Sequence, residues 1–292
     1  MKIIRFKDEN QTAVAVVNDE ESVFRLPGED FIDLIRAAEE KNCSIVDWVK
    51  QSIQDQQPLE QKLVELTLKV PVEAPEVWAA GVTYQRSREA RNYEATDGKM
   101  DAQTFYDKVY EADRPEIFFK STAARTVGPE QDVMIRSDSN WQVPEAELGL
   151  VLNRKGEILG YTIGNDLSCR DIEGENPLYL PQAKIWRNSC SIGPAIRLAE
   201  TVEDPYQLTI ACRIWRNGTM VFEDVANTRQ LKRRYGELVE YLARDNVLFD
   251  GTVLLTGTCI VPPNDFTLQI GDRIEIEVPE IGVLVNNVNG RQ

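Results

Sequence analysis

The chain has 292 residues, with 33 basic and 48 acidic side chains and a formal net charge of −15. This charge argues against binding to nucleic acids or to anionic membrane surfaces, because both depend on Lys and Arg side chains that face phosphates. Hydrophobic residues make up 42% of the sequence, which is enough for a folded core and argues against intrinsic disorder.

The sequence contains no histidine. This excludes Ser-His-Asp and Cys-His catalytic arrangements and metal sites with imidazole ligands. Acid–base chemistry would then depend on carboxylates, lysine, tyrosine, cysteine or metal-bound water. The five cysteines are dispersed, which is typical of reduced thiols. We expect a cytoplasmic protein, because the sequence shows neither a signal peptide nor an apolar run of roughly 18 residues.

Residues 1–70 predict a small N-terminal α+β domain. Ile3–Phe6 and Ala13–Val17 are short apolar runs on either side of a polar turn, as expected of two strands. Asp30–Glu40 has apolar residues at helical spacing, and Ser44 resembles the N-cap of a second helix.

Residues 71–292 predict a second domain that consists mostly of strands. An apolar strand over 77–82 and a charged helix over 85–92 come first. Short strands then alternate with Gly, Pro and Asn-Asp turns, and a helix is predicted for 228–244. The chain therefore predicts an α+β, mostly β fold, with a mixed β-roll catalytic domain after the small N-terminal domain. The candidate strands of this part are 116–120, 145–152, 157–164, 208–216, 252–256 and 272–278.

A pair of glutamates on one of these strands is the strongest candidate for chemistry. Glu145 and Glu147 are two positions apart, so their side chains point to the same face. A hairpin that pairs Leu152 with Glu157 places Asp166 on this face, diagonal to Glu145. Diagonal neighbours lie about 7–8 Å apart at Cα, within side-chain reach of a common point.

The same register places Thr162 opposite Glu147 and Gly164 opposite Glu145, which favours a polar site with space beside it. Three carboxylates without an arginine or a histidine among them would repel one another, and a divalent cation would resolve this. Oxygen ligands select Mg²⁺ first, with Mn²⁺ or Ca²⁺ as alternatives. The competing interpretation is a solvated acidic strand face, and a one-residue bulge in the turn would move Asp166 to the other face.

Short motifs around these carboxylates follow one another in a specific order. They are P-E-I-F-F-K at 115–120, P-E-A-E-L-G-L-V at 144–151, G-N-D-L-S-C-R-D at 164–171, A-K at 183–184, G-P at 193–194 and T-G-T at 256–258. Together they resemble the fumarylacetoacetate hydrolase family over roughly residues 72–290. The resemblance implies the β-roll fold and an oligomer, either a homodimer or a homotetramer.

The resemblance also implies roles for individual residues. It implies a Mg²⁺ ion held by Glu145, Glu147 and Asp166, with an active-site lysine at Lys184. A lysine desolvated beside a divalent cation can be a neutral amine near pH 7 and transfer protons. Glu116 is the candidate partner carboxylate. Each role has a structural alternative, such as a salt bridge for the lysine. The candidate substrate-binding residues are Ser87, Arg170, Thr258 and Tyr84.

Two departures from the family's hydrolases bear on the reaction. Those hydrolases carry G-x-N-Y-x-x-H-x-x-E, whereas this chain has Ser87 at the position of the histidine and Ala90 at that of the glutamate. The His–Glu pair that activates water is therefore missing. The polar segment 173–182, which leads into Lys184, resembles the sugar-acid dehydratase branch of the family.

These features imply a Mg²⁺-dependent dehydratase that acts on a 2-keto-3-deoxy sugar acid, such as 2-keto-3-deoxy-D-arabinonate. The reaction would form an enolate by loss of a C3 proton and then expel the C4 hydroxyl. One alternative is a C–C hydrolase or decarboxylase of an acylpyruvate- or oxaloacetate-type substrate. An alternative of another class is a non-catalytic protein that binds a metal or a sugar acid. The partner is a small 2-keto acid in the catalytic interpretations.

Overall fold

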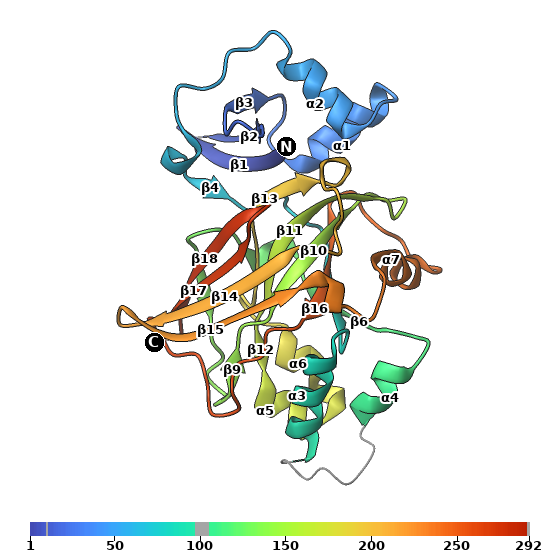
Figure 1. Cartoon of the computed structure of the whole chain (residues 1–292), viewed down its shortest axis with the longest axis vertical. Helices are drawn as coiled ribbons and strands as arrows, with labels where there is room; N and C mark the ends of the chain where they lie inside the picture. The colour runs from blue at the N-terminus through green and yellow to red at the C-terminus, as the bar shows by residue number, and fades with distance from the viewer. Residues whose placement is uncertain (10, 97–104, 291–292) are drawn as a thin grey trace.

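The computed structural model describes residues 1–9, 11–96 and 105–290 (Figure 1). One large mixed sheet runs from the N-terminal segment to the centre of the molecule. Its strands, in sheet order, are β3 (Val23–Leu26), β2 (Gln11–Val17), β1 (Lys2–Asp8), β13 (Cys190–Leu198), β11 (Ile158–Asp166), β10 (Ala146–Leu152), β16 (Thr252–Thr258), β5 (Val77–Gly81) and β6 (Glu116–Ser121), with β4 (Leu68–Lys69) beside β1 and β7 (Thr126–Val127) beside β13.

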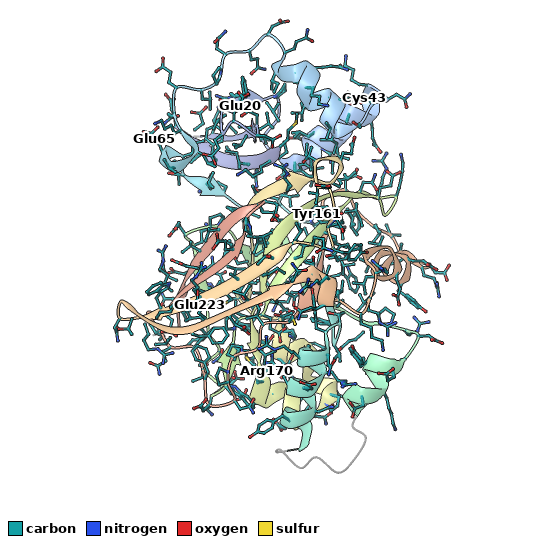
Figure 2. The ribbon with its side chains drawn as sticks, in the orientation of Figure 1. Glu20, Cys43, Glu65, Tyr161, Arg170 and Glu223 are labelled. Atoms are coloured by element: carbon teal, nitrogen blue, oxygen red, sulfur yellow. The ribbon has the colours of Figure 1, made fainter. Side chains whose placement is uncertain are left out.

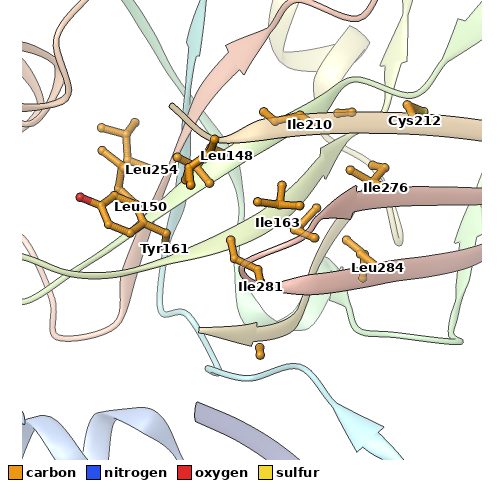
Figure 3. Packing of buried hydrophobic residues seen from close by; sticks show 14 of the residues in the cluster. Leu148, Leu150, Tyr161, Ile163, Ile210, Cys212, Leu254, Ile276, Ile281 and Leu284 are labelled. Carbon is orange, nitrogen blue, oxygen red and sulfur yellow. The ribbon is translucent and has the colours of Figure 1, made fainter. Parts of the chain in front are cut away.

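Two smaller sheets complete the β structure. One has the order β15 (Thr219–Asn227), β14 (Thr209–Arg216), β17 (Arg273–Val278), β18 (Gly282–Asn289) and β8 (Asp132–Met134), and the other pairs β12 (Ser168–Cys169) with β9 (Gln142–Val143). The mostly β architecture agrees with the predicted fold class. A large apolar cluster fills the space between the central hairpin and the five-stranded sheet (Figure 3). It includes Leu148, Leu150, Tyr161, Ile163, Ile210, Cys212, Ile276 and Leu284.

Most helices lie at two ends of the molecule, whereas α7 lies at its side (Figure 1). Two of them, α1 and α2, cover the N-terminal strands, and three others, α3, α5 and α6, lie together at the far end. Their bounds are α1 (Phe31–Glu40), α2 (Ile45–Ile53), α3 (Gln85–Thr96), α4 (Phe105–Glu111), α5 (Arg170–Glu175), α6 (Leu180–Lys184) and α7 (Tyr235–Ala243), with 3₁₀ turns at Leu63–Glu65, Ala123–Arg125, Pro177–Tyr179, Ala199–Thr201 and Thr228–Gln230.

The N-terminal helices form where capping and apolar spacing predict them. The side chain of Asp30 accepts a hydrogen bond from the amide of Ile32 at the start of α1. Ser44 accepts one from the amide of Asp47 at the start of α2, as its position in the sequence predicted. The apolar stripe of each helix is buried against the sheet.

The predicted helix over 228–244 is shorter in the structure, because only Tyr235–Ala243 is α-helical. A separate 3₁₀ turn precedes it, capped by Asn227. Between the two, the amide of Lys232 donates to the carbonyl of Thr83. This hydrogen bond to a distant part of the chain replaces an intrahelical one, which periodicity alone could not reveal.

The central hairpin forms as predicted, but its register differs. Leu152 lies opposite Ile158 instead of Glu157. An irregularity then follows, after which Val151 lies opposite Gly160. The turn and the irregularity therefore each add one residue to the strand β11 relative to the predicted pairing.

The two offsets leave the far end of the hairpin two residues out of the predicted register. Glu147 lies opposite Gly164, not Thr162, and the amide of Asp166 donates to the carbonyl of Glu145 at 3.0 Å. A shift of one residue would exchange the two faces of the strand, whereas a shift of two restores them. Glu145, Glu147 and Asp166 therefore still share one face.

The N-terminal strands are hydrogen-bonded into the central sheet. Lys2 and Ile3 of β1 pair with Arg197 and Ile196 of β13. The division of the chain into domains at residues 70 and 71 stays a prediction. In the part of the chain described, no helix has the length and apolar character needed to cross a membrane. All five cysteines are free thiols.

Candidate active site

The three predicted carboxylates converge at one end of the β10–β11 hairpin. Glu145 directly precedes β10, Glu147 is its second residue, and Asp166 is the last residue of β11. One carboxylate oxygen from each lies within 4.8 Å of the others, and all three residues are buried. The group is therefore compact enough to share one ion.

Cations lie among these carboxylates, and one of them, Arg170, corrects the expectation that no arginine would lie there. Arg170 places its Nη2 atom 2.8 Å from Glu145 Oε1. Lys184 places its Nζ atom 2.6 Å from Glu145 Oε2. Lys120 places its Nζ atom 2.5 Å from Asp166 Oδ1. Arg170, Lys184 and Lys120 come from α5, α6 and β6, respectively, so the contacts join parts of the chain that are far apart in sequence.

Lys184 occupies the centre of this cluster. It ends the short helix α6, and its side chain is 1% exposed. Besides Glu145, its ammonium contacts Ser168 Oγ at 2.5 Å, Glu173 Oε1 at 3.2 Å and Asp166 Oδ2 at 3.5 Å. A buried lysine held among carboxylates and a hydroxyl is well placed to exchange a proton with a ligand at the same point.

The buried charges of the cluster do not balance. Four carboxylates and three cations leave a surplus of one negative charge, in a region where uncompensated charge is costly. Burial, followed by the neighbouring Asp166 and Glu145 carboxylates, raises the pKa of Glu147 well above its usual range, although the amide of Gly257 donates to its carboxylate at 2.6 Å. A divalent cation would relieve this repulsion, and the oxygen donors suit Mg²⁺. The buried members are Glu145, Glu147, Asp166, Glu173, Lys120, Lys184 and Arg170.

A pocket of about 560 Å³ reaches the cluster from outside. Both Glu116 and Glu173 line it, together with residues of α4 and the segment 177–180. Glu116 pairs with Gly81 across β5 and β6, and a Cβ atom at Gly81 would lie 2.1 Å from Glu116 Oε2. The glycine therefore leaves the space that the Glu116 carboxylate occupies.

A larger pocket, of about 740 Å³, lies at the turn end of the hairpin, between α1 and residues 153–155. It contains none of the candidate site residues, so the smaller pocket is the candidate entrance for a substrate.

The remaining predicted substrate-binding residues, Ser87, Tyr84 and Thr258, are also buried. Ser87 lies on α3, which packs against α5 (Figure 2 labels Arg170 of α5 at this end of the molecule). Tyr84 belongs to the main apolar cluster, and its burial raises the pKa of its hydroxyl. Thr258 uses its hydroxyl to donate to the carbonyl of Ala146 at 2.9 Å, which ties β16 to β10. Their contacts with a substrate stay predictions, as do the roles of the other site residues.

Two buried members of the cluster were not singled out from the sequence. Lys120 follows the apolar residues of β6, where alternation gives no signal for a buried cation. Glu173 lies three residues after Arg170 on α5, and this helical spacing was a signal that could have linked the two.

Comparisons with known proteins agree with this geometry. The family described as "Fumarylacetoacetate (FAA) hydrolase C-terminal" matches residues 86–289. The chain is 47% identical over 258 residues to "Probable 2-keto-3-deoxyxylonate dehydratase" of Haloferax volcanii, covering 88% of this chain and 87% of the relative. It is 41% identical over 293 residues to "2-dehydro-3-deoxy-D-arabinonate dehydratase" of Saccharolobus solfataricus, covering 100% and 97% of the two chains.

A solved structure of 2-keto-3-deoxy-D-arabinonate dehydratase complexed with magnesium and 2,5-dioxopentanoate is also similar. Its TM-score is 0.83 and its sequence identity 38%, over the full length of both chains. The family match covers most of the sequence, and the similarity to two dehydratases extends over most or all of the chain. This chain therefore belongs to the fumarylacetoacetate hydrolase family.

Proposed function

We propose that this chain is a Mg²⁺-dependent dehydratase of a five-carbon 2-keto-3-deoxy sugar acid. The observation that carries the proposal is the buried Lys184 ammonium beside the carboxylates that can hold a metal, in a chain without histidine. The full-length similarity to dehydratases supports the same reaction.

Glu145, Glu147 and Asp166 would hold the ion. When bound, Mg²⁺ would supply a Lewis acid that makes the C3 proton of a 2-keto acid more acidic. Arg170 donates to Glu145 and so fixes the orientation of that carboxylate.

Lys184 is the candidate for proton transfer at C3. Its Nζ atom lies among Glu145, Asp166 and Glu173, so it can move a proton without help from imidazole. Departure of the C4 hydroxyl needs a proton donor on the pocket side. Glu116 stays our candidate for this step, because it lines the pocket together with Glu173.

The chain offers little support for the hydrolytic alternative. Hydrolysis needs an activated water, and Ser87 stands where the family's hydrolases carry histidine. The buried Ser87 hydroxyl is a weak base that cannot replace an imidazole. Elimination of water needs no attacking water molecule, so it fits the residues present.

The substrate can be defined further from its chemistry. A five-carbon acid with a keto group at C2 and no hydroxyl at C3 has C4 as its sole stereocentre. Acids derived from arabinonate and xylonate are therefore the same compound when their C4 configuration is the same. The two relatives named for these acids thus point to one substrate class.

We also propose that the protein is cytoplasmic and forms a homodimer or a homotetramer. The free thiols of all five cysteines support a reducing compartment. Light scattering on the purified protein would determine its oligomeric state.

An assay with both C4 enantiomers of the 2-keto-3-deoxy pentonate tests the proposed function. With Mg²⁺, we expect one enantiomer to lose water and give a five-carbon dicarbonyl acid, detected by ¹³C NMR without chain cleavage. Glu147→Gln is the control and should be inactive. Two carbon fragments, or no turnover of either enantiomer, would contradict the proposal.

A further inference from the structure

A second buried lysine, Lys120, contacts the backbone of Lys184, the residue that we assign to proton transfer. Its side chain is fully buried, and its Nζ atom contacts three acceptors. These are Asp166 Oδ1 at 2.5 Å, the carbonyl of Leu167 at 2.8 Å and the carbonyl of Lys184 at 2.5 Å. An ammonium has three N–H donors, so these acceptors use all of them. Lys120 therefore has no donor left for a substrate.

The contact with the Lys184 carbonyl matters because of where Lys184 lies. The helix α6 has 5 residues, too few to be stable alone, and Lys184 is its last residue. The carbonyls of a final helical turn lack intrahelical partners, and a cation is favourable beside them. The Lys120 ammonium and the Ser189 hydroxyl, at 3.1 Å, both donate to this carbonyl.

Lys184 is thus held at both ends. Its backbone carbonyl is fixed through Lys120 to Asp166, and its Nζ atom faces Glu145 and Glu173. We propose that Lys120 is a positioning residue, which fixes the end of α6 against Asp166 and so aims the Lys184 ammonium at the reaction site. This inference rests on the proposed role of Lys184 in proton transfer.

If Lys120 positions Lys184, the variant Lys120→Met should show a specific combination of effects. The substrate does not touch Lys120, so KM should change by less than about threefold. A correctly placed proton-transfer group contributes a factor of ~10²–10⁴ in rate, and a misplaced one loses most of this contribution. We therefore expect kcat to fall about 100-fold. Removal of a positive charge beside Asp166 should leave the affinity for Mn²⁺ unchanged or increase it, as measured by calorimetry on the metal-free protein.

Two further variants make the test independent of folding. Lys120→Arg keeps the charge but places its donors in one plane on a longer side chain, so we expect a folded protein with about a tenfold lower kcat. Lys7→Met is the matched control, since Lys7 is an exposed lysine on strand β1, and it should behave like the wild type.

A purely structural role would give the opposite pattern. Lys120→Met would then lose thermal stability and Mn²⁺ affinity, while the metal-saturated enzyme kept its kcat. A kcat within threefold of wild type in the Met variant, or in the Arg variant if the former does not fold, would overturn the proposal. Failure of the wild type to dehydrate either enantiomer would contradict the proposed function instead, and the Mn²⁺ measurement does not depend on turnover.

Discussion

Replacement of Lys184 by methionine tests the proposed mechanism most directly. The change removes an ammonium that lies 2.6 Å from Glu145 and 3.2 Å from Glu173, in a position that is 1% exposed. Proton transfer by a positioned side chain contributes a factor of ~10²–10⁴ in rate. This corresponds to about 2.7–5.4 kcal/mol of the activation barrier, so we expect kcat to fall by two to four orders of magnitude.

The same change should lower stability in a metal-dependent way. Loss of one partner from a buried ion pair costs about 3–5 kcal/mol, because the other charge stays buried without compensation. Bound metal would offset part of this, since an ion at 100 times its Kd stabilises the native state by about 2.7 kcal/mol. The melting temperature of Lys184→Met should therefore fall in EDTA and recover partly in Mg²⁺.

Lys184→Arg separates proton transfer from electrostatics. Arginine keeps the positive charge but does not give up its proton near neutral pH. We therefore expect stability close to that of the wild type but a kcat almost as low as that of the methionine variant. Initial rates and exchange of the C3 protons in D₂O, followed by NMR, measure both effects. An arginine variant with more than a tenth of the wild-type kcat would refute the assignment of Lys184 as the proton-transfer group.

Further predictions concern the carboxylates. Glu147→Gln should abolish Mn²⁺ binding in calorimetry while the circular dichroism spectrum is retained, and unchanged binding would reject the metal site. Gly81→Ala should displace the Glu116 carboxylate, since the new Cβ would lie 2.1 Å from Oε2. Its kcat should fall about tenfold with Mn²⁺ affinity unchanged, and an unaltered kcat would exclude a role for Glu116. Because burial and the neighbouring Asp166 and Glu145 carboxylates raise the pKa of Glu147, Mn²⁺ affinity should weaken on acidification, as this carboxylate takes up a proton. The same raised pKa means that protonation of Glu147 favours the folded metal-free protein, so its contribution to stability in EDTA should grow as the pH falls and be lost as the pH rises through the raised pKa. A pH-independent affinity would contradict this reasoning.

Local patterns in the sequence predicted the elements that carry the site. Alternation and the turn at 153–156 predicted the hairpin, and the spacing of Glu145 and Glu147 predicted their shared face. The exact pairing was wrong by two residues, because the turn and the irregularity near Val151 each add one residue to β11. The carboxylates still converge, since an even offset preserves the face.

Long-range contacts were beyond the reach of these patterns. Lys120 of β6 contacts Asp166 of β11 although three strands lie between them in the order of the sheet, and the local sequence of neither residue encodes this contact. The length of α7 was overestimated for a related reason, because Lys232 is hydrogen-bonded to Thr83 of a distant segment. The roles of Ser87 and Thr258 stay predictions, since only a bound substrate would show contacts with them.

The pairing of β1 with β13 has a consequence for any attempt to reduce this protein to its catalytic part. Removal of residues 1–70 would leave the Ile196–Arg197 end of β13 as an open sheet edge, two strands away from β10. It would also expose apolar residues of β13 and β16 that share one buried cluster with residues of α1 and α2. Open edges and bared apolar faces promote aggregation between copies. The N-terminal segment therefore covers the sheet that carries the metal ligands. Its removal should make the protein aggregate, although none of the catalytic residues would be deleted.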